Sequence, residues 1–386
     1  MTSVTHDPTA FSQLAAEWDD LLARSASRAY FLRHHWVSAW WQHYAPPAAR
    51  LHILTCRTAA GRLVAVAPLY RIERGILGLS SIRELLFLGT GVATKTSEYL
   101  DVIVERGLES IANRALAESL RSHPDWDRLW LHQLPHASPN LTHLAALFPD
   151  AVVQECDRAP FIHTADGWEA FKRSLGRSMR RNVEYYPRRL QRTHTVVLSR
   201  AETPAAIDEG LDALVRLHQE SWQRRGEPGA FACHSLEPFL RQAAHHGIAD
   251  GQTRLWTLRI DDRIEAALIG FLDNGVLHYF QKGFNLDFAD DELGNVMVAL
   301  CVRACCEDPA IRIFDFMGGG APYKQLWGRQ SIESRTMTVH RRNHRTALYE
   351  TRDRVRARTI DFLRWITPMS LRAARRAYLK RRRLRE

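Results

Sequence analysis

The sequence lacks any uncharged apolar stretch long enough to cross a bilayer, which takes about 20 residues. Its first residues also lack the basic segment and apolar run of a secretory signal peptide. These absences predict a chain without a spanning helix and favour a cytoplasmic location. Cysteine is scarce as well, since the 386 residues hold six cysteines and no paired CxxC motif. Cys301, Cys305 and Cys306 follow a helical spacing in an apolar run, so we interpret them as buried thiols and expect no metal site.

The positive charge of the chain is concentrated in two segments. The formal net charge is +10, yet residues 171–192 and residues 371–386 each carry +7, which leaves the rest slightly acidic. The first segment, which includes Arg177 and Arg181, forms a solvated helix face, attracts a phosphate or an anionic lipid, or lines a nucleic-acid groove. The second segment follows the apolar stretch at 362–371. It predicts either a helix that lies on an anionic membrane surface or an unstructured basic end.

The length of the chain exceeds what one hydrophobic core usually holds, so we expect two domains. The stretch that begins at Arg50 resembles the one that begins at Arg254, because each has a hairpin pattern followed, after more sheet and a helix, by an apolar strand. This pattern predicts an internal duplication of one α/β (α+β) unit with a mostly antiparallel mixed sheet flanked by helices. The expected parts are a first domain at 1–165, a basic bridging helix and linker strand at 166–200, a second domain at 201–345 and a basic helical tail at 346–386.

Two local predictions concern the second half of the chain. Apolar residues step by three or four from Trp168 to Leu190, which predicts one amphipathic helix that Pro187 kinks or shortens. The alternating segment SIESRTMTV at 331–339 predicts a strand that pairs beside the strand at Ile311.

The stretch IRIFDFMGGGAPYKQLWG at 311–328 has the pattern of a strand that ends at the rim of a site. The three glycines at 318–320 can adopt positive φ or let a ligand approach the main chain. Asp315, Tyr323 and Lys324 bring charge and proton-transfer groups to the same edge. The alternative is a strand end, a loop and a helix start that bind nothing.

Three stretches of the sequence have counterparts in a known family. They are FKRSLGRSMRRNVEYYPRRL at 171–190, the hairpin unit that ends in HYFQKGFN at 278–285, and FDFMGGGAPYKQLWG at 314–328. Together they resemble the GNAT superfamily of acetyltransferases in its duplicated, Fem-like form. The last stretch is similar to the branch named for the cellulose-biosynthesis protein CelD, in which Phe-Asp-Phe, a glycine and Tyr-Lys precede Trp-Gly. The resemblance runs from roughly residue 31 to residue 339.

The resemblance implies two tandem GNAT-like domains and a donor that is acetyl-CoA or another acyl-CoA. In such folds acyl-CoA lies along a splayed strand, here residues 277–282. Its pyrophosphate lies at the start of the next helix, here residues 293–296, where unpaired N–H groups attract an anion. The cofactor-binding residues implied are Tyr279, Phe280, Gly294, Asn295 and Val296.

Four acidic residues precede this helix start and count against a pyrophosphate there. They are Asp287, Asp290, Asp291 and Glu292. Their carboxylates would repel a pyrophosphate unless a cation or the basic segments compensate. They also have a structural interpretation, because acidic residues stabilise the N-terminus of a helix.

Acyl transfer needs a base for the proton of the acceptor, a proton donor for the departing thiolate and support for the oxyanion. His278 and Asp315 are the expected base and its orienting partner, because their strands should be neighbours. Tyr323 is the expected acid. The alternative for His278 is a sheet histidine with a satisfied hydrogen bond. The expected substrate-binding residues are Glu98, Asp101, Lys282, Lys324, Trp327, Arg177 and Arg181. Glu98 and Asp101 have an alternative interpretation as polar residues at a strand edge, and Trp327 has one as an anchor for the loop.

The leading prediction is an acyl-CoA-dependent acyltransferase that acts on a sugar, an amine or an envelope or exopolysaccharide precursor. One alternative is a Fem-like aminoacyl transferase that uses charged tRNA, which the poor pyrophosphate turn and the basic helix motivate. Another is a non-catalytic, membrane-peripheral subunit of a polysaccharide synthase, which the basic tail motivates. The expected partners are a small-molecule or glycan-precursor acceptor and the anionic surface at the inner face of the membrane. Among nucleic acids only tRNA is considered, as the donor under the aminoacyl-transferase alternative.

Overall fold

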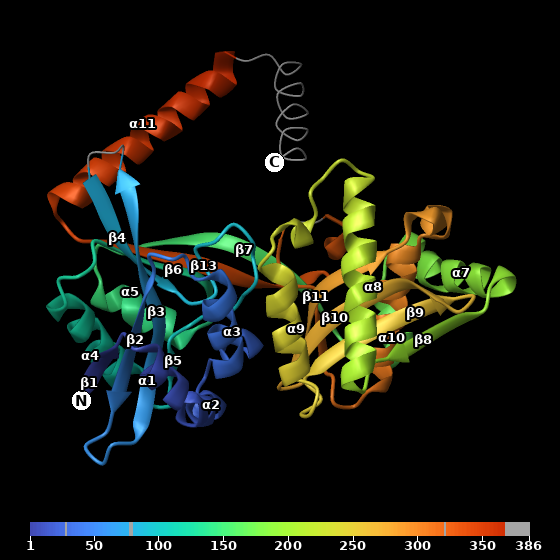
Figure 1. The fold of residues 1–386 in the computed structure, drawn as a ribbon, viewed down its shortest axis with the longest axis horizontal. Coiled ribbons are helices and arrows are strands. Elements are labelled where there is room, and N and C mark those ends of the chain that lie inside the picture. The colour runs from blue at the N-terminus through green and yellow to red at the C-terminus, as the bar shows by residue number, and fades with distance from the viewer. Residues whose placement is uncertain (28, 77–79, 320–321, 367–386) are drawn as a thin grey trace. The chain divides into compact units, whose positions relative to one another are not determined.

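The computed structural model describes residues 1–27, 29–76, 80–319 and 322–366 (Figure 1). The chain separates into two compact units: unit 1 combines Met1–Cys156 with the chain from Glu333 onward, and unit 2 is Asp157–Ile332. These bounds differ from the domain limits expected at residues 165, 200 and 345. The basic tail expected at 371–386 and the third glycine of 318–320 lie outside the described residues. Within the described ranges no helix is both long and apolar enough to cross a membrane.

Unit 1 is built on a mixed sheet with the strand order β1-β2-β3-β4-β6-β13. Its strands are β1 (Thr2–Thr5), β2 (Arg50–Arg57), β3 (Leu63–Ile76), β4 (Ser80–Phe87), β6 (Arg128–Pro135) and β13 (Gln330–His340), with β5 (Ile103–Val104) paired to β3. Neighbours are antiparallel except β4 and β6, which are parallel. The helices are α1 (Pro8–Gln13), α2 (Ala15–Arg24), α3 (His34–Tyr44), α4 (Glu109–Ser122), α5 (Pro139–Leu147) and α11 (His344–Ile366).

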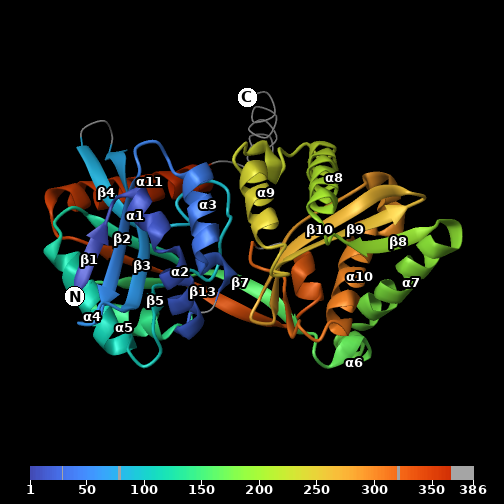
Figure 2. The same cartoon turned by 60° about the horizontal axis from the view of Figure 1, so that its bottom comes forward.

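The sheet of unit 2 is also mixed, with the strand order β8-β9-β10-β11-β12-β7. Its strands are β7 (Val152–His163), β8 (Val196–Arg200), β9 (Thr253–Ile260), β10 (Arg263–Asp273), β11 (Val276–Phe284) and β12 (Ile313–Asp315). Only β11 and β12 run parallel; the other pairs are antiparallel. The helices are α6 (Gly167–Ser174), α7 (Arg177–Thr193), α8 (Pro204–Gln223), α9 (Leu236–His246) and α10 (Leu293–Glu307). Figure 2 shows α8 and α9 on one face of this sheet and α6, α7 and α10 on the other.

The two units repeat the same order of elements, as the predicted duplication requires. In each, a first strand leads to helices, then to three antiparallel strands, a helix and a strand parallel to the third of them: β4 with β6 in unit 1 and β11 with β12 in unit 2. The predicted fold class, a duplicated α/β unit with a mostly antiparallel sheet flanked by helices, is confirmed.

The last strand of each sheet comes from the other half of the chain. β7 follows β6 in the sequence but pairs with β12, and β13 follows β12 but pairs with β6. The predicted pairing of residues 331–339 beside the strand at Ile311 is therefore wrong. The reason is that His163 of β7 already lies opposite Ile313, whereas β6 needs an antiparallel neighbour, which β13 supplies from Ser334 to His340.

The basic segment at 168–190 forms two helices, where one was predicted. The chain is extended at Leu175 (ψ 148°), which ends α6, and Gly176 then precedes α7. Pro187 lies inside α7 and does not end it. Apolar periodicity continues across the break because both helices pack on the same core, through Phe171, Val183 and their neighbours.

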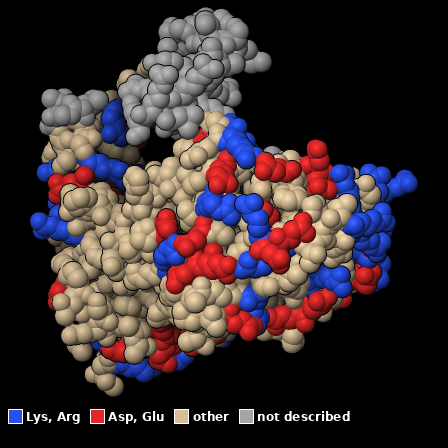
Figure 3. Space-filling model, turned by 45° about the vertical axis from the view of Figure 1, so that its right-hand side comes forward, with Lys and Arg blue, Asp and Glu red and all other residues tan. Residues whose placement is uncertain are grey.

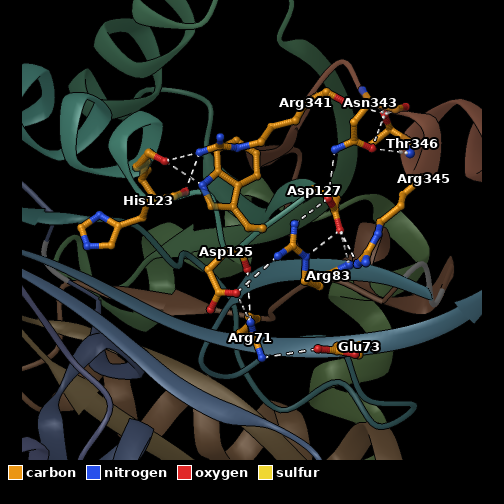
Figure 4. A network of polar contacts seen from close by, with 12 residues as sticks. Arg71, Glu73, Arg83, His123, Asp125, Asp127, Arg341, Asn343, Arg345 and Thr346 are labelled. Carbon is orange, nitrogen blue, oxygen red and sulfur yellow. Dashed lines mark hydrogen bonds and ion pairs between the residues drawn. The ribbon is translucent and has the colours of Figure 1, made fainter. Parts of the chain in front are cut away.

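A buried polar network fixes the connection from β13 to α11 within unit 1 (Figure 4). Asp127 is fully buried and accepts hydrogen bonds from Arg83 Nε and Nη2, both 2.9 Å away, and from Asn343 Nδ2 at 3.0 Å. Burial raises the pKa of Asp127, but the hydrogen bonds from Arg83 and Asn343 and the charge of Arg83 together outweigh burial, so the pKa is lowered. Arg341 donates to three carbonyls at the end of α4 while its guanidinium covers the Trp126 ring at 4.4 Å. The contacts of Arg341 thus satisfy the helix terminus and hold the returning chain.

Candidate functional site

Strand β11 contains a β-bulge at Phe280. In the pairing of β11 with β10, Tyr279 lies opposite Gly270 and Gln281 lies opposite Ile269. Phe280, between them, therefore has no residue opposite it. A bulge breaks the alternation of side chains along a strand. Lys282, which strict alternation would place on the face of His278, therefore lies on the face of Tyr279.

Strand β12 accompanies β11 for three residues only. The pairing runs from Val276 opposite Ile313 to His278 opposite Asp315. The chain then turns into the glycine loop, where Met317 adopts a left-handed conformation with φ 54°. The two parallel strands thus diverge at His278, and the rest of β11 has no residue of β12 beside it.

A cavity of about 400 Å³ lies at this diverging end of β11. Its walls come from α8, β11, the start of α10 and two short 3-10 helices, η3 (Leu286–Asp291) and η4 (Pro322–Leu326). Small-molecule sites commonly have volumes of roughly 300–1,000 Å³, so the size suits a ligand or part of one. Five of the residues predicted from the sequence line it: Tyr279, Lys282, Gly294, Asn295 and Tyr323.

Lys282 is the central charged group of the cavity. Its Nζ donates to the main-chain oxygen of Gly294 at 3.0 Å and lies 4.7 Å from the centre of the Tyr323 ring. Within the described residues no carboxylate forms an ion pair with it. Burial, together with the charges of Arg225 and Lys324, lowers the pKa of Lys282 from 10.5 to about 7. A lysine with this pKa is partly neutral at pH 7 and can accept a proton.

Two tyrosines bring their hydroxyl groups together beside this amine. The hydroxyl oxygens of Tyr279 and Tyr323 are 3.4 Å apart. Tyr279 is 4% exposed and packs against Phe314 and Phe316, and burial raises the pKa of both tyrosines. Both phenols therefore hold their protons at neutral pH and can donate them.

The start of α10 differs from a glycine-rich phosphate turn. Glu292 precedes the helix in a left-handed conformation (φ 52°), and its carboxylate accepts a hydrogen bond from Asn295 Nδ2 at 2.8 Å. A Cβ on Gly294 would lie 2.9 Å from the ring of Phe284, so this glycine makes room for an aromatic neighbour. Across the described chain the N–H groups of Leu293 and Gly294 make no hydrogen bond, which leaves two donors at the helix terminus.

Basic residues compensate two of the four acids that precede α10. Asp287 pairs with Arg224 at 2.6 Å, and Asp291 pairs with Arg189 of α7 at 3.0 Å. Figure 3 likewise shows acidic and basic side chains interspersed over the face that it presents. The repulsion expected from the sequence is therefore reduced, although Glu292 keeps its carboxylate at the cavity wall.

The predicted pair of His278 and Asp315 forms, but away from the cavity. His278 Nδ1 lies 2.9 Å from Asp315 Oδ2, and Asp315 Oδ1 accepts the N–H of Met317 at 2.8 Å. Both side chains are buried, at 4% and 0% exposure, and neither lines the cavity. The pair joins β11 to β12 where the strands begin to diverge.

Four other predicted residues of unit 2 have packing or loop contacts. The Phe280 ring packs on Phe271 at 5.7 Å, Val296 is buried in the core, and Trp327 is 3% exposed, with its ring 5.9 Å from that of Phe316. Lys324 Nζ donates to the carbonyl oxygens of Met317 at 3.1 Å and Gly318 at 2.7 Å, so it holds the glycine loop. None of the four lines the cavity.

The remaining predicted residues lie elsewhere. In unit 1, Glu98 is buried and pairs with Lys95 at 2.5 Å. Asp101 is 1% exposed and accepts hydrogen bonds from three side chains, among them Ser27 and Ser138, while burial raises its pKa to about 6. In unit 2, the two arginines of α7 at 177 and 181 are exposed. Glu98 and Asp101 thus have structural partners within unit 1, and the two arginines face solvent.

His218, Arg225 and Glu292 line the cavity but were not predicted as site residues. His218 Nδ1 lies 2.9 Å from the carbonyl oxygen of Lys282, and its Nε2 accepts the N–H of Ala230 at 3.1 Å. Nδ1 therefore carries the proton, and burial lowers the pKa of this histidine. The sequence signal for His218 was its place on the apolar stripe of the helix expected at 204–224. That stripe does not reveal its hydrogen-bond partner, the carbonyl of Lys282, which lies 64 residues further along the chain.

Comparison with known proteins identifies part of unit 2. Residues 177–325 match the family described as acetyltransferase (GNAT) domain. The matched segment contains the bulged strand, the start of α10 and the two tyrosines, so these cavity residues lie in the part of the chain that is similar to the GNAT domain. The match does not distinguish acyl from aminoacyl transfer. No curated protein matches the sequence.

Solved structures share the fold over most of the chain. FemX has a TM-score of 0.59 and 10% identity, covering 87% of this chain and 98% of its own. A conserved protein of unknown function from Bacteroides thetaiotaomicron has a TM-score of 0.55 and 11% identity, covering 88% and 100%. The C-terminal domain of a putative lysylphosphatidylglycerol synthetase from Agrobacterium fabrum has a TM-score of 0.52 and 10% identity, covering 89% and 96%. At such identities these likenesses establish the fold alone.

Proposed function

We propose that unit 2 transfers an acyl group from an acyl-CoA, with acetyl-CoA as the first candidate, to an amino or hydroxyl group of a small acceptor. The observation that carries this proposal is the cavity at the diverging end of β11, in which Lys282 and Tyr323 lie side by side. The match of residues 177–325 to the acetyltransferase (GNAT) domain supports the class of reaction.

The residues around the cavity fit an acyl-CoA. The N–H groups of Leu293 and Gly294 at the helix terminus are suited to a pyrophosphate oxygen. The diverging end of β11 gives an extended arm a strand to lie along. When bound, acyl-CoA would supply the activated acyl carbon and a thiolate leaving group.

The side chains of the cavity supply both proton transfers. The neutral amine of Lys282 takes the proton from the acceptor nitrogen or oxygen as the new bond to the acyl carbon forms. The hydroxyl of Tyr323 gives a proton to sulfur as the carbon–sulfur bond breaks. Both groups return to their first state by exchange with solvent. His278 and Asp315, the base and orienter expected from the sequence, instead hold β11 against β12 where the two strands begin to diverge.

The acceptor is proposed from the sequence resemblance. The CelD-like branch points to a sugar or an amine of an envelope or exopolysaccharide precursor. A cavity whose walls carry both amine and phenol groups is compatible with a polar acceptor of this kind.

Binding of CoA and acetyl-CoA, measured by isothermal titration calorimetry, tests the donor. We expect Ala289→Trp to lower the affinity at least about tenfold, because Ala289 is exposed at the cavity wall and an indole there occupies the space. Ala205→Trp is the matched control, because Ala205 is exposed on α8 and outside the cavity. The proposal is wrong if neither compound binds at up to about 1 mM, the upper end of usual KM values.

Release of free thiol during incubation with a panel of amino sugars and amines tests the transfer. We expect Lys282→Arg to lower the rate by roughly a hundredfold or more, because arginine keeps the charge but does not release its proton at neutral pH. Tyr323→Phe should lower the rate while leaving donor binding unchanged. Full activity of Lys282→Arg would exclude the base role and leave Lys282 as a binding cation.

A second candidate is aminoacyl transfer from charged tRNA. It is favoured by Glu292, whose carboxylate at the cavity wall repels a pyrophosphate, and by the exposed arginines at 177 and 181. A filter-binding assay at low salt distinguishes the two donors. Binding of aminoacylated tRNA without binding of CoA would replace the first proposal, and failure of tRNA to bind would remove the second.

A further inference from the structure

Unit 1 contains a second cavity, of about 540 Å³, that the proposed transfer reaction does not use. Its walls come from β3, β4, β6, the loop at 89–97 and one face of α11. Every lining residue belongs to unit 1, so the cavity is complete within that unit.

The loop at 89–97 is held in place by specific contacts. Gly91 has φ 83°, and a Cβ there would lie 2.2 Å from the hydroxyl of Tyr70, which donates to the carbonyl oxygen of Thr90 at 2.8 Å. Ser97 accepts the indole N–H of Trp36 at 3.0 Å. This wall is therefore fixed by the core of unit 1 before any ligand arrives.

The cavity wall carries more positive than negative charge. Arg74 and Arg128 both pair with one carboxylate, that of Glu84, which is 1% exposed. Of the two other cations of the wall, Lys95 pairs with Glu98 and Arg352 pairs with Asp353. One guanidinium charge thus remains in excess beside Glu84.

Side chains of β6 form a row of rings and charge along the cavity. The Arg128 guanidinium lies 5.7 Å from the centre of the Trp130 ring, and the ring of His132 stacks on Trp130 at 4.6 Å with an interplanar angle of 7°. Residues at positions i, i+2 and i+4 of a strand share one face, so the three form a continuous surface. Such a surface suits a ligand that combines hydrogen-bonding groups with an apolar face.

Two buried polar atoms at the ends of this row have no hydrogen-bond partner in the part of the chain that the structure describes. They are the donor Nε of Arg128 and the acceptor Oε1 of Gln133. Gln133 is 2% exposed and has a left-handed backbone (φ 68°) at a bulge where β6 slips against β13. An unpaired buried acceptor and a strained backbone both cost free energy, and both are typical of ligand-binding positions. Gln133 lies five positions after Arg128, a distance of roughly 16 Å along the strand, which is longer than a single small anion.

We propose that this cavity binds an acidic saccharide of two or more rings. The negative group lies at Arg74 and Arg128, the sugar rings lie along Trp130 and His132, and a hydroxyl donates to Oε1 of Gln133. A neutral saccharide leaves the excess guanidinium charge unpaired, and an inorganic anion does not reach Gln133. The proposal stands independently of acyl transfer in unit 2.

Calorimetric titration of the whole protein with four probes tests the proposal. The probes are digalacturonate, glucose 6-phosphate, cellobiose and inorganic phosphate. We expect digalacturonate to bind at least about tenfold more tightly than cellobiose or inorganic phosphate. Glucose 6-phosphate is an acidic sugar of one ring: tighter binding of it than of digalacturonate would show that a phosphorylated monosaccharide fills the cavity and would contradict a ligand of two or more rings.

Two variants and a control locate the binding. Arg74→Gln should weaken digalacturonate binding about tenfold, because it removes the excess charge. Gln133→Met should also weaken it about tenfold, yet without lowering the melting temperature, because methionine removes the unpaired acceptor while keeping the volume. Arg354→Gln is the control, since Arg354 is exposed on α11 and outside the cavity. Equal affinity in all variants, or absence of binding by both acidic sugars, would overturn the proposal.

Discussion

Lys282 should lose its proton near pH 7, about 3 units below an ordinary lysine. Its pKa falls from 10.5 to about 7 because the amine is buried and two cations, Arg225 and Lys324, lie near it. At about 1.36 kcal/mol per unit, the folded protein favours the neutral amine by roughly 4–5 kcal/mol more than water does. At pH 7 about half of the molecules then carry a neutral amine, more than about a thousandfold above the fraction for a solvated lysine.

Selective labelling with lysine that carries 13C at Cε makes this titration measurable, because the shift of Cε follows the protonation of Nζ. The chain has only five lysines, at positions 95, 172, 282, 324 and 380, so the spectrum is simple. Lys282→Met assigns the signal by its loss. Lys172 is the internal reference, since hydrogen bonds to Glu184 and Glu169 raise its pKa. A Lys282 midpoint above about pH 9.5 would show that burial does not control this amine and would refute the base role.

The same shift predicts the sign of a stability change. The unfolded chain holds the Lys282 proton up to pH 10.5, whereas the folded chain releases it near pH 7. Between these values the unfolded state binds more protons, so this group makes the free energy of unfolding rise with pH. Lys282→Met should lack that rise and should be more stable than wild type at about pH 6, because it no longer buries a charged amine. Urea denaturation at about pH 6 and pH 9 checks both statements, and a parallel pH dependence of the two proteins would contradict them.

Two further predictions concern packing and buried charge. Gly283→Ala should destabilise the protein by about 1–3 kcal/mol in chemical denaturation, because the added Cβ lies 2.6 Å from a main-chain oxygen of α8. Gly75→Ala is the control and should change stability little, because the space around Gly75 is open. Equal effects of the two substitutions would refute the packing argument. The buried carboxyl of Asp101 has a pKa of about 6, so between about pH 4 and pH 6 it keeps its proton in the folded state while the unfolded chain has lost it. Over this range Asp101 should therefore make the free energy of unfolding fall by about 3 kcal/mol as the pH rises. Asp101→Asn should remove that decrease from the pH profile, and an unchanged profile would show that the carboxyl is ionised throughout.

The sequence determined the class of fold and predicted several residues that line the candidate site. Apolar periodicity placed the strands and helices of both halves, and the parallel between the stretches at Arg50 and Arg254 predicted the duplication. The Ile311 stretch and residues 277–296 together hold most of the cavity wall. These features are local, since they depend on spacing and turn residues that a single segment contains.

Only the tertiary structure decided which side chains meet. The bulge at Phe280 moves Lys282 to the face of Tyr279, and no alternation pattern reveals a bulge. His278 and Asp315 pair with each other but lie outside the cavity, because β12 accompanies β11 for three residues only.

Long-range pairing accounts for the other differences. β13 supplies the edge of unit 1 because β7 already lies beside β12, a choice that depends on strands far apart in the sequence. The lowered pKa of Lys282 likewise arises from burial among separate elements and from the nearby charges of Arg225 and Lys324. Spacing in the sequence predicts faces and turns, whereas burial, register and the free energy of a charge are properties of the packed whole.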